Sequence, residues 1–236
     1  MPYESMQQPV APDTPHRIFL QPIAAPSILG LYALAGGVFV ISTYMAHWYG
    51  GSEAMWMLIP FVVFFGGLAQ FLAGMWAYKA RDGLATVLHG MWGAFFMGYS
   101  FLYLVSEFGR TPVASLPTSG LFPAMGVSFI VLAAITWVIA GAAAAESRSL
   151  ISTMVLLAAG ATLAAIGLLT AVEALTIIAG WVLFVSSLFA WYTASALLLE
   201  DACGREIWGL GKSRRMKDAP PVVAGIGEPG VIHGQA

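Results

Sequence analysis

The sequence predicts an all-α integral membrane protein, a bundle of six transmembrane helices with both termini in the cytoplasm. Of its 236 residues, 59% are hydrophobic and 9% are charged, whereas about a quarter of a soluble domain is charged. The apolar residues fall into six long blocks separated by short polar breaks. They do not alternate in polarity, as the strands of a membrane barrel would. Lipid is therefore the solvent that the chain requires.

Each apolar block is close to the roughly 20 residues that a helix needs to cross a ~30 Å hydrocarbon core. We expect helices over residues 27–46, 55–78, 84–106, 122–145, 149–171 and 176–199. Together they form one membrane domain, 27–199, between a Pro-rich cytoplasmic arm, 1–26, and a cytoplasmic tail, 200–236. The arm lacks a charged start followed by an apolar run, so it is not predicted to be a cleaved signal peptide.

Positive charges give the predicted orientation. Nine of the ten Lys and Arg residues lie before the first span, after the sixth, or in the connections between spans two and three and spans four and five. Only Arg110 lies in a connection on the other side. The positive-inside rule therefore assigns both termini to the cytoplasm of a multi-pass protein in the inner or plasma membrane.

The connections and small residues indicate a compact bundle. The breaks at 80–83 and 146–148 are so short that the helices on either side must pack antiparallel. The longest connection, 107–121, contains two prolines and is predicted to be an ordered outer loop. Glycine pairs at 36–37 and 66–67 let helix backbones approach closely. Plain packing, a narrow pore and an oligomer interface each fit this pattern.

Composition and motifs exclude several classes of function. Ten Lys and Arg in a chain of net charge −2 offer no basic surface, so we expect no nucleic-acid partner. The 211–213 string Gly-Lys-Ser lacks the earlier glycine of a phosphate loop, because position 206 is Glu. No serine-nucleophile or zinc-protease motif is present, so we predict no enzyme. The only cysteine, Cys203, allows no intramolecular disulfide.

Two histidines near span ends, His47 and His89, raise the question of a haem or metal site. Spans one and three both run outward, and His47 lies near the end of span one whereas His89 lies near the start of span three. One site cannot use both, so we expect no cofactor and no metal. His89 is expected ~8 Å inside the inner face. It is either a packed or hydrated histidine or a pH-sensitive residue at the inner mouth.

Three groups of residues resemble the acetate uptake transporter family, which includes the succinate–acetate permeases. Residues 25–31, APSILGL, are similar to the family's Asn-Pro-Ala-Pro-Leu-Gly-Leu signature. The signature residues in this sequence are Pro26, Leu29, Gly30 and Leu31. Residues 65–70, FGGLAQ, with Ala73-Gly74 and Tyr78-Lys79, resemble its second helix. Its sixth helix is similar to 179–181 and 190–192, with Gly204-Arg205 beyond.

The resemblance implies a six-helix protomer, commonly assembled as a hexamer, that carries small monocarboxylates such as acetate, and sometimes succinate. It also implies a hydrophobic constriction of the pore at Leu34, Trp92 and Leu157. These residues lie seven or eight positions beyond the starts of spans one, three and five, so each is about 10–12 Å deep. The common depth fits a dewetting gate, and ordinary core packing would use similar residue types.

The spans offer no buried Arg or Lys to hold a carboxylate tightly. Passage is therefore expected to depend on weak hydrogen-bond donors along the pathway, which we assign to Gln70, Ser100, Thr153 and Tyr192. The predicted function is channel-like movement of acetate or acetic acid. Two alternatives remain open: a pore for another small solute such as urea, an amide or formate, and a non-catalytic membrane subunit of a larger complex.

Overall fold

The computed structural model describes residues 24–49, 53–108 and 118–217. Most of the predicted N-terminal arm, the end of the tail and the centre of the predicted outer loop lie outside these ranges. Ala25–Pro221 form one compact unit. Apart from one isolated β-bridge, the regular structure of the described residues is helical, as predicted.

Six helical stretches correspond to the six predicted spans, and each begins and ends within four residues of the prediction. They are α1 (Pro26–Met45), the composite of α2 (Glu53–Phe61), η1 (Val62–Ala69) and α3 (Gln70–Lys79), then α4 (Gly83–Phe108), α5 (Thr118–Ala143), α6 (Arg148–Thr170) and α7 (Glu173–Cys203). A single turn, α8 (Arg214–Lys217), follows.

Five helices in the described ranges are long and apolar enough to cross a membrane: Pro26–Met45, Ala54–Lys79, Pro123–Ala143, Arg148–Thr170 and Glu173–Cys203. The helix α4, which we predicted as the third span, is not among them although it has 26 residues. Its sequence includes His89, Ser100, tyrosines and glycines, which lower its mean hydropathy. The long helix outside this set therefore carries several of the polar groups described below.

The second span changes its winding at its centre. Pro60 lies inside α2, and a π-helix, η1, begins two residues later and ends immediately before Gln70. Proline donates no backbone hydrogen bond. π-Helical segments inside α-helices are rare, and those that occur are often at functional sites. The predicted single span is thus one continuous helix in three parts, with the irregular part next to a predicted pathway residue.

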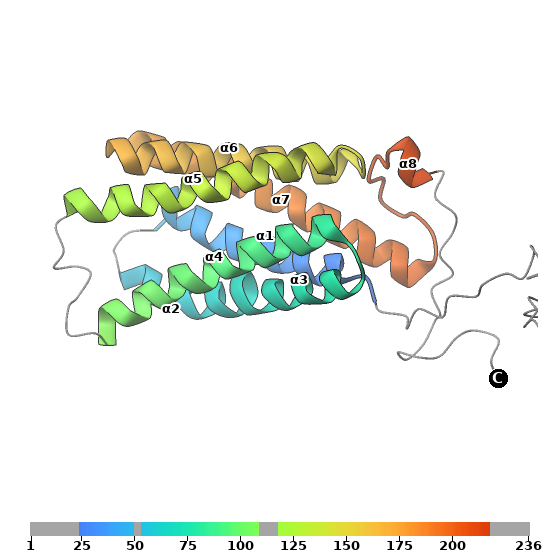
Figure 1. Cartoon of the computed structure of the whole chain (residues 1–236), viewed down its shortest axis with the longest axis horizontal. Coiled ribbons are helices and arrows are strands. Elements are labelled where there is room, and N and C mark those ends of the chain that lie inside the picture. Colours follow the sequence, from blue (N-terminus) through green and yellow to red (C-terminus); the bar gives the residue numbers. More distant parts are fainter. Residues whose placement is uncertain (1–23, 50–52, 109–117, 218–236) are drawn as a thin grey trace, which may run out of the picture. The chain divides into compact units, whose positions relative to one another are not determined.

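The helices surround a core of buried side chains. Contacts run in a closed order, in which α1 packs on α7, α7 on α6, α6 on α5, α5 on α4 and α4 on α1. The span formed by α2, η1 and α3 packs against α1 and α4 (Figure 1). The hydrophobic core cluster draws its residues from α1, η1, α4, α5, α6 and α7 and includes Leu34, Trp92 and Leu157. The core therefore lies between the helices in which the predicted constriction was placed.

Glycines bring α1, η1, α3 and α4 into close contact, as the small-residue pattern predicted. A Cβ atom on Gly37 would lie 2.5 Å from the Cα atom of Gly66. A Cβ atom on Gly74 would lie 2.6 Å from the backbone nitrogen of Gly90. Only glycine fits at these crossings, so they fix the relative heights of the helices.

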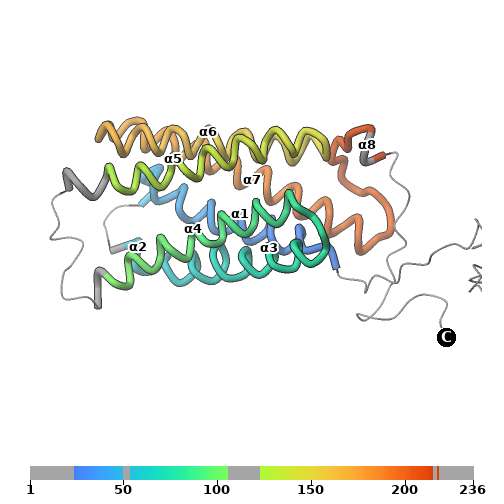
Figure 2. Tube along the Cα trace, in the orientation of Figure 1, coloured from blue at the N-terminus to red at the C-terminus, as the bar shows by residue number. Residues whose placement is uncertain are grey.

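One end of the unit gathers the start of α1, the α3–α4 turn, the α5–α6 turn and the segment after α7 (Figure 2). Lys79, Arg81, Arg148 and Lys212 belong to these segments, and we call this the basic end. At the opposite end α1 ends and α7 begins, and there His47 Nδ1 lies 3.9 Å from a carboxylate oxygen of Glu173. The two histidines considered for a shared metal site thus lie at opposite ends.

Candidate functional site

One face of α4 is buried along most of its length and carries both polar and aromatic groups. His89, Trp92, Phe96 and Ser100 follow one another at intervals of three or four residues, so they share a face of the helix. Their exposed fractions are 0%, 2%, 1% and 0%. Trp92 therefore lies between two buried polar side chains, about 4.5 Å along the axis from His89 and about 12 Å from Ser100.

The three residues predicted to form the constriction are all buried in the same cluster, with exposed fractions of 1% for Leu34, 2% for Trp92 and 0% for Leu157. The Trp92 indole is fixed by its Nε1–H, which donates to Thr136 Oγ1 on α5 at 3.0 Å. The Thr136 hydroxyl in turn donates to the carbonyl of Leu132. This chain of hydrogen bonds holds the ring at one height against α5.

Neighbouring contacts show that the three side chains lie at similar heights. A Cβ atom on Gly30 would lie 2.5 Å from ring atoms of His89. Leu34 is four residues beyond Gly30, and Trp92 is three beyond His89, so the two rise together. Trp92 bonds to Thr136, which lies seven residues before the end of α5. Leu157 lies nine residues after the start of the antiparallel helix α6, so it is at a height similar to that of Thr136 and Trp92.

Gln70 lies at the same height. A Cβ atom on Gly93 would be 2.6 Å from the backbone nitrogen of Phe71, so α3 and α4 touch at these residues. Gln70 and Trp92 are their immediate neighbours in the chain. The Gln70 side chain has no exposed surface. A primary amide is thus buried at the level of Leu34, Trp92 and Leu157, which we call the apolar layer.

Several buried polar atoms have no hydrogen-bond partner within the described part of the chain. They are both polar atoms of the Gln70 amide, both ring nitrogens of His89, and the Ser100 hydroxyl. Burying such an atom without a partner costs on the order of 1–3 kcal/mol, and native proteins have few of them. They lie at three heights of one interior, where a water or a small polar molecule would find hydrogen-bond partners.

The other two predicted pathway residues differ in their surroundings. Thr153 is fully buried, and its hydroxyl donates to the carbonyl of Ser149. Its own carbonyl accepts a hydrogen bond from Ser186. Tyr192 is 39% exposed, and its hydroxyl donates to the Gly209 carbonyl at 3.0 Å. The structure therefore brings Gln70, Ser100 and Thr153 into the interior, whereas Tyr192 contacts the segment after α7.

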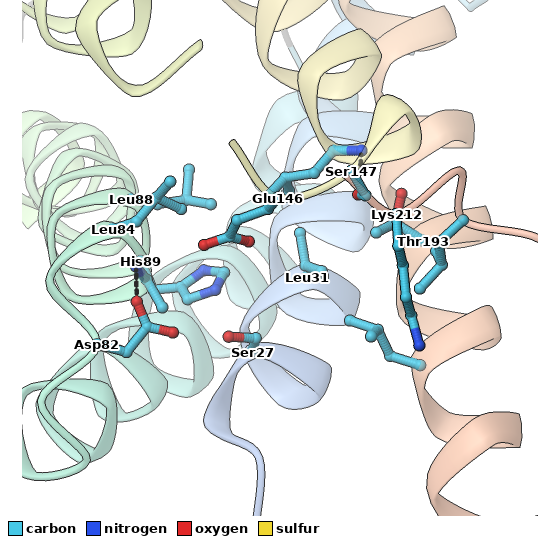
Figure 3. A pocket seen from close by; sticks show the side chains of 14 residues that line it. Ser27, Leu31, Asp82, Leu84, Leu88, His89, Glu146, Ser147, Thr193 and Lys212 are labelled. Atoms are coloured by element: carbon cyan, nitrogen blue, oxygen red, sulfur yellow. Dashed lines mark hydrogen bonds between the residues drawn. The ribbon is translucent and has the colours of Figure 1, made fainter. Parts of the chain in front are cut away.

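A pocket opens at the basic end and is lined in part by the first turns of α4, including His89. It contains about 530 Å³ of empty space, part of it open to solvent. Figure 3 shows the His89 imidazole pointing into it between Ser27, Leu31 and Glu146. Asp82 and Lys212 also line it. Leucine and alanine make up half of the lining residues, so the pocket is a mainly apolar recess with polar groups at its rim, and it adjoins the buried face of α4 at His89.

Residues 204–213, which we call the strap, cross the basic end of the bundle. The ring of Trp208 stacks on Tyr192 with 5.5 Å between centroids and an angle of 7°. The backbone nitrogens of Arg148 and Ser149 donate to the carbonyls of Gly211 and Leu210 at 3.1 Å.

The strap also closes one side of the pocket. Leu210 is 3% exposed, and Lys212 pairs with Glu200 at the end of α7. Both Leu210 and Lys212 line the pocket. The predicted tail therefore begins with an ordered segment that sequence reasoning missed. The apolar residues Ile207, Trp208 and Leu210, which follow the last span closely, are the signal that could have indicated it.

The signature residues lie at the start of α1. Pro26 occupies the first turn, where its missing N–H is not needed. Leu29 is 41% exposed, Leu31 is 2% exposed and lines the pocket, and Gly30 contacts the His89 ring. The motif thus begins the helix beside the pocket and leaves room for an imidazole.

The interior lacks charge throughout the described residues. Their buried polar side chains are Ser, Thr, Gln and His, with no Asp, Glu, Lys or Arg among them. The same residues contain no group of three or more His, Cys, Asp or Glu that could hold a metal ion. A solute in this interior would meet neutral hydrogen-bonding groups and apolar rings.

Comparisons with known proteins agree with this architecture. The sequence model of the GPR1/FUN34/yaaH family matches residues 6–203. A comparison with curated proteins finds no match. A solved structure described as the bacterial acetate channel SatP is similar in fold, with a TM-score of 0.72 and 22% sequence identity. The match covers 80% of this chain and 99% of that chain.

Proposed function

Because the chain belongs to the GPR1/FUN34/yaaH family, the acetate uptake transporter family that its motifs predicted, we propose that it conducts small monocarboxylates, acetate first, through a narrow and mainly hydrophobic pore. As a member of this family it is a multi-pass membrane protein and not an enzyme. The proposal extends to six spans, with α4 as the third, and to the basic end and both termini in the cytoplasm.

The observation that carries the proposal is the row of unpartnered polar atoms across an uncharged interior. The Gln70 amide and the Ser100 hydroxyl are fully buried and have no partner among the described residues. An apolar layer of Leu34, Trp92 and Leu157 lies at the height of Gln70. A solute with one small polar group can hydrogen-bond at these positions, whereas a large or multiply charged solute loses its hydration without compensation.

In this pore the apolar layer acts as the constriction, and Gln70, Ser100 and Thr153 supply hydrogen bonds along the pathway. Tyr192, also expected on the pathway, contributes by holding the strap over the basic end, because its hydroxyl and ring both contact that segment. Binding is weak because no fixed cation is buried in the described interior, so transport is fast and of low affinity.

The test is uptake of radiolabelled acetate into liposomes that contain the purified chain, at pH 5 and pH 7. We expect uptake well above that of protein-free liposomes at both pH values. Equal uptake with and without protein would contradict the proposal. Competition by succinate, formate, urea and acetamide in the same assay would rank the substrates and test the alternative of another small solute.

We also propose that the chain forms a homo-oligomer, a hexamer by the resemblance. Large apolar side chains are exposed on the outer faces of the bundle, among them Phe61, Phe64 and Phe65 near η1 and Trp137 and Val138 on α5. Lipid or neighbouring protomers would cover them. Native mass spectrometry of the purified chain should give six copies, and a mass that includes another polypeptide would favour a subunit of a larger complex.

A further inference from the structure

We propose that His89 is the residue that receives the carboxyl group of the transported acid at the basic end of the pore, a role that rests on the proposed function. His89 was not among the pathway residues expected from the sequence. Its side chain is fully buried, and both ring nitrogens lack a partner within the described residues. The imidazole points into the basic-end pocket (Figure 3).

The contacts around the ring indicate that the surrounding helices are shaped to hold an imidazole, and not that the ring merely fills a packing gap. Gly30 has no side chain where a Cβ atom would meet three ring atoms at 2.5 Å. The hydroxyl-bearing Ser27 lies one turn earlier on α1 and lines the same pocket. A packed core histidine would bond to a backbone carbonyl or a hydroxyl, because an unpartnered buried nitrogen is costly. Here both nitrogens are left for a molecule that enters the pocket.

The chemistry of the ring matches one carboxyl group at a time. A neutral imidazole has one N–H donor and one acceptor nitrogen. The donor binds an oxygen of a carboxylate, and the acceptor binds the O–H of an undissociated acid. No proton transfer is needed in either case. Because the ring lies about one helical turn from Trp92, an acid released by the apolar layer reaches it within a few ångströms.

The charged groups that face the pocket come from three other segments. Asp82 lies in the α3–α4 turn, Glu146 in the α5–α6 turn and Lys212 in the strap, where it pairs with Glu200. The pocket-lining residues of α1 and α7 are Ser27, Leu31, Thr193 and Leu197, which carry no charge. Among the described residues, no arginine lines the pocket. His89 is thus the fully buried polar group through which the pocket meets the pore.

The experiment measures acetate binding directly, by saturation-transfer NMR on the purified full chain in lipid nanodiscs. The test variants are His89→Phe, which keeps a ring, and His89→Leu, which is smaller. We expect each to raise the apparent Kd for acetate about 5- to 10-fold, the effect of one lost hydrogen bond. The variant His89→Gln keeps a donor and an acceptor, so its Kd should stay within about twofold of the wild-type value.

The control is His47→Asn, which removes the histidine at the opposite end. Asparagine tolerates the positive φ of 57° at that position, and acetate binding should not change. Titration of the ¹⁵N-histidine-labelled wild type gives a second measurement that needs no variant to fold. The His89 imidazole resonance should shift with acetate, and the His47 resonance should not.

Measurements at pH 5 and pH 7.5 identify the form that binds. If His89→Phe loses affinity for acetate at pH 5 alone, the undissociated acid is the form that binds His89. If it loses affinity at both pH values, the anion is the form that binds. Acetate affinity equal to wild type in folded His89→Phe and His89→Leu, with an unmoved His89 resonance, would overturn the inference while leaving the proposed function in place. Absence of both flux and binding in the wild type would instead remove the proposed function.

Discussion

The methyl group that Gly30 lacks would occupy the space of the His89 imidazole, at 2.5 Å from three ring atoms. Gly30→Ala should therefore lower the Tm by the equivalent of about 1–3 kcal/mol, the usual cost of overpacking. In a His89→Ala background the ring is absent, and the same change should leave the Tm unchanged or raise it, because Ala favours a helix by up to about 1 kcal/mol. Thermal unfolding in detergent measures both.

Gly141→Ala on α5 is the matched control for the Gly30 cycle. A Cβ atom at Gly141 would have no neighbour within 4 Å, and the residue is exposed. This variant should be neutral or slightly stabilising. If Gly30→Ala destabilised the protein equally with and without the imidazole, the contact would not be the reason for the glycine.

Trp92 is both the largest side chain of the apolar layer and a hydrogen-bond donor to Thr136. Trp92→Ala should widen the layer and raise the flux of propionate and butyrate relative to acetate by several fold. Its stability should fall by about 3–5 kcal/mol, as for other buried Trp-to-Ala changes. Liposome flux per folded protein, with a panel of acids, measures the ratio.

The variant Thr136→Val separates these two effects of Trp92. It removes the hydroxyl that accepts the indole N–H but keeps the tryptophan ring. We expect a loss of stability of about 1–3 kcal/mol without a change in the ratio of acids. A folded Trp92→Ala protein with the wild-type ratio would assign the layer to core packing.

At the scale of elements, the strap is held by groups that can be removed singly. Tyr192→Phe deletes the hydrogen bond to the Gly209 carbonyl and keeps the ring that stacks on Trp208. The strap should then open more often, by about fivefold for a loss near 1 kcal/mol. Hydrogen exchange of the Arg148 and Ser149 amides, which donate to the strap, measures this opening.

Trp191→Phe is the matched control for the strap. Trp191 is the neighbour of Tyr192 in the chain, but its ring packs edge-on against Phe39 of α1 rather than against the strap. Exchange at Arg148 and Ser149 should be unchanged in this variant. Equal exchange in Tyr192→Phe and wild type would mean that the backbone bonds alone hold the segment.

The long elements could be predicted from the sequence because their cause is local. Twenty or so consecutive apolar residues form a helix in lipid whatever surrounds them, and the ends of α1 and α6 follow within one residue. The strap could not be predicted in this way. Its backbone bonds to Arg148 and Ser149 join residues about sixty positions apart, and no local pattern specifies them.

The site was predictable only in part for a similar reason. Counting residues along three parallel helices gave a common depth for Leu34, Trp92 and Leu157, because the rise per residue is constant. The direction of each side chain depends on which helices are neighbours. Tyr192 therefore contacts the strap, and His89 is fully buried with no hydrogen-bond partner among the described residues, a property that depth alone does not give.

At the scale of the whole molecule, the bundle separates neutral and charged groups. The interior of the described residues holds polar but uncharged side chains, and the charges lie at the two ends. A transmembrane voltage acts on fixed charges within the membrane field. The protein itself should therefore respond little to voltage, and any voltage dependence of acetate flux would come from the solute.

The orientation of the bundle can be tested with the protein's own chemistry, because Cys203 is the only cysteine in the chain and it is exposed. It is the last residue of α7, at the basic end. If the basic end faces the cytoplasm, as the positive-inside rule predicts, a membrane-impermeant maleimide should label Cys203 in inside-out vesicles and not in intact cells.

Val172→Cys in a Cys203→Ser background provides the reverse control, since Val172 lies in the α6–α7 turn at the opposite end and is 43% exposed. Labelling of Cys203 in intact cells, with Val172→Cys protected there, would invert the bundle and make the His89 pocket the outer mouth of the pore.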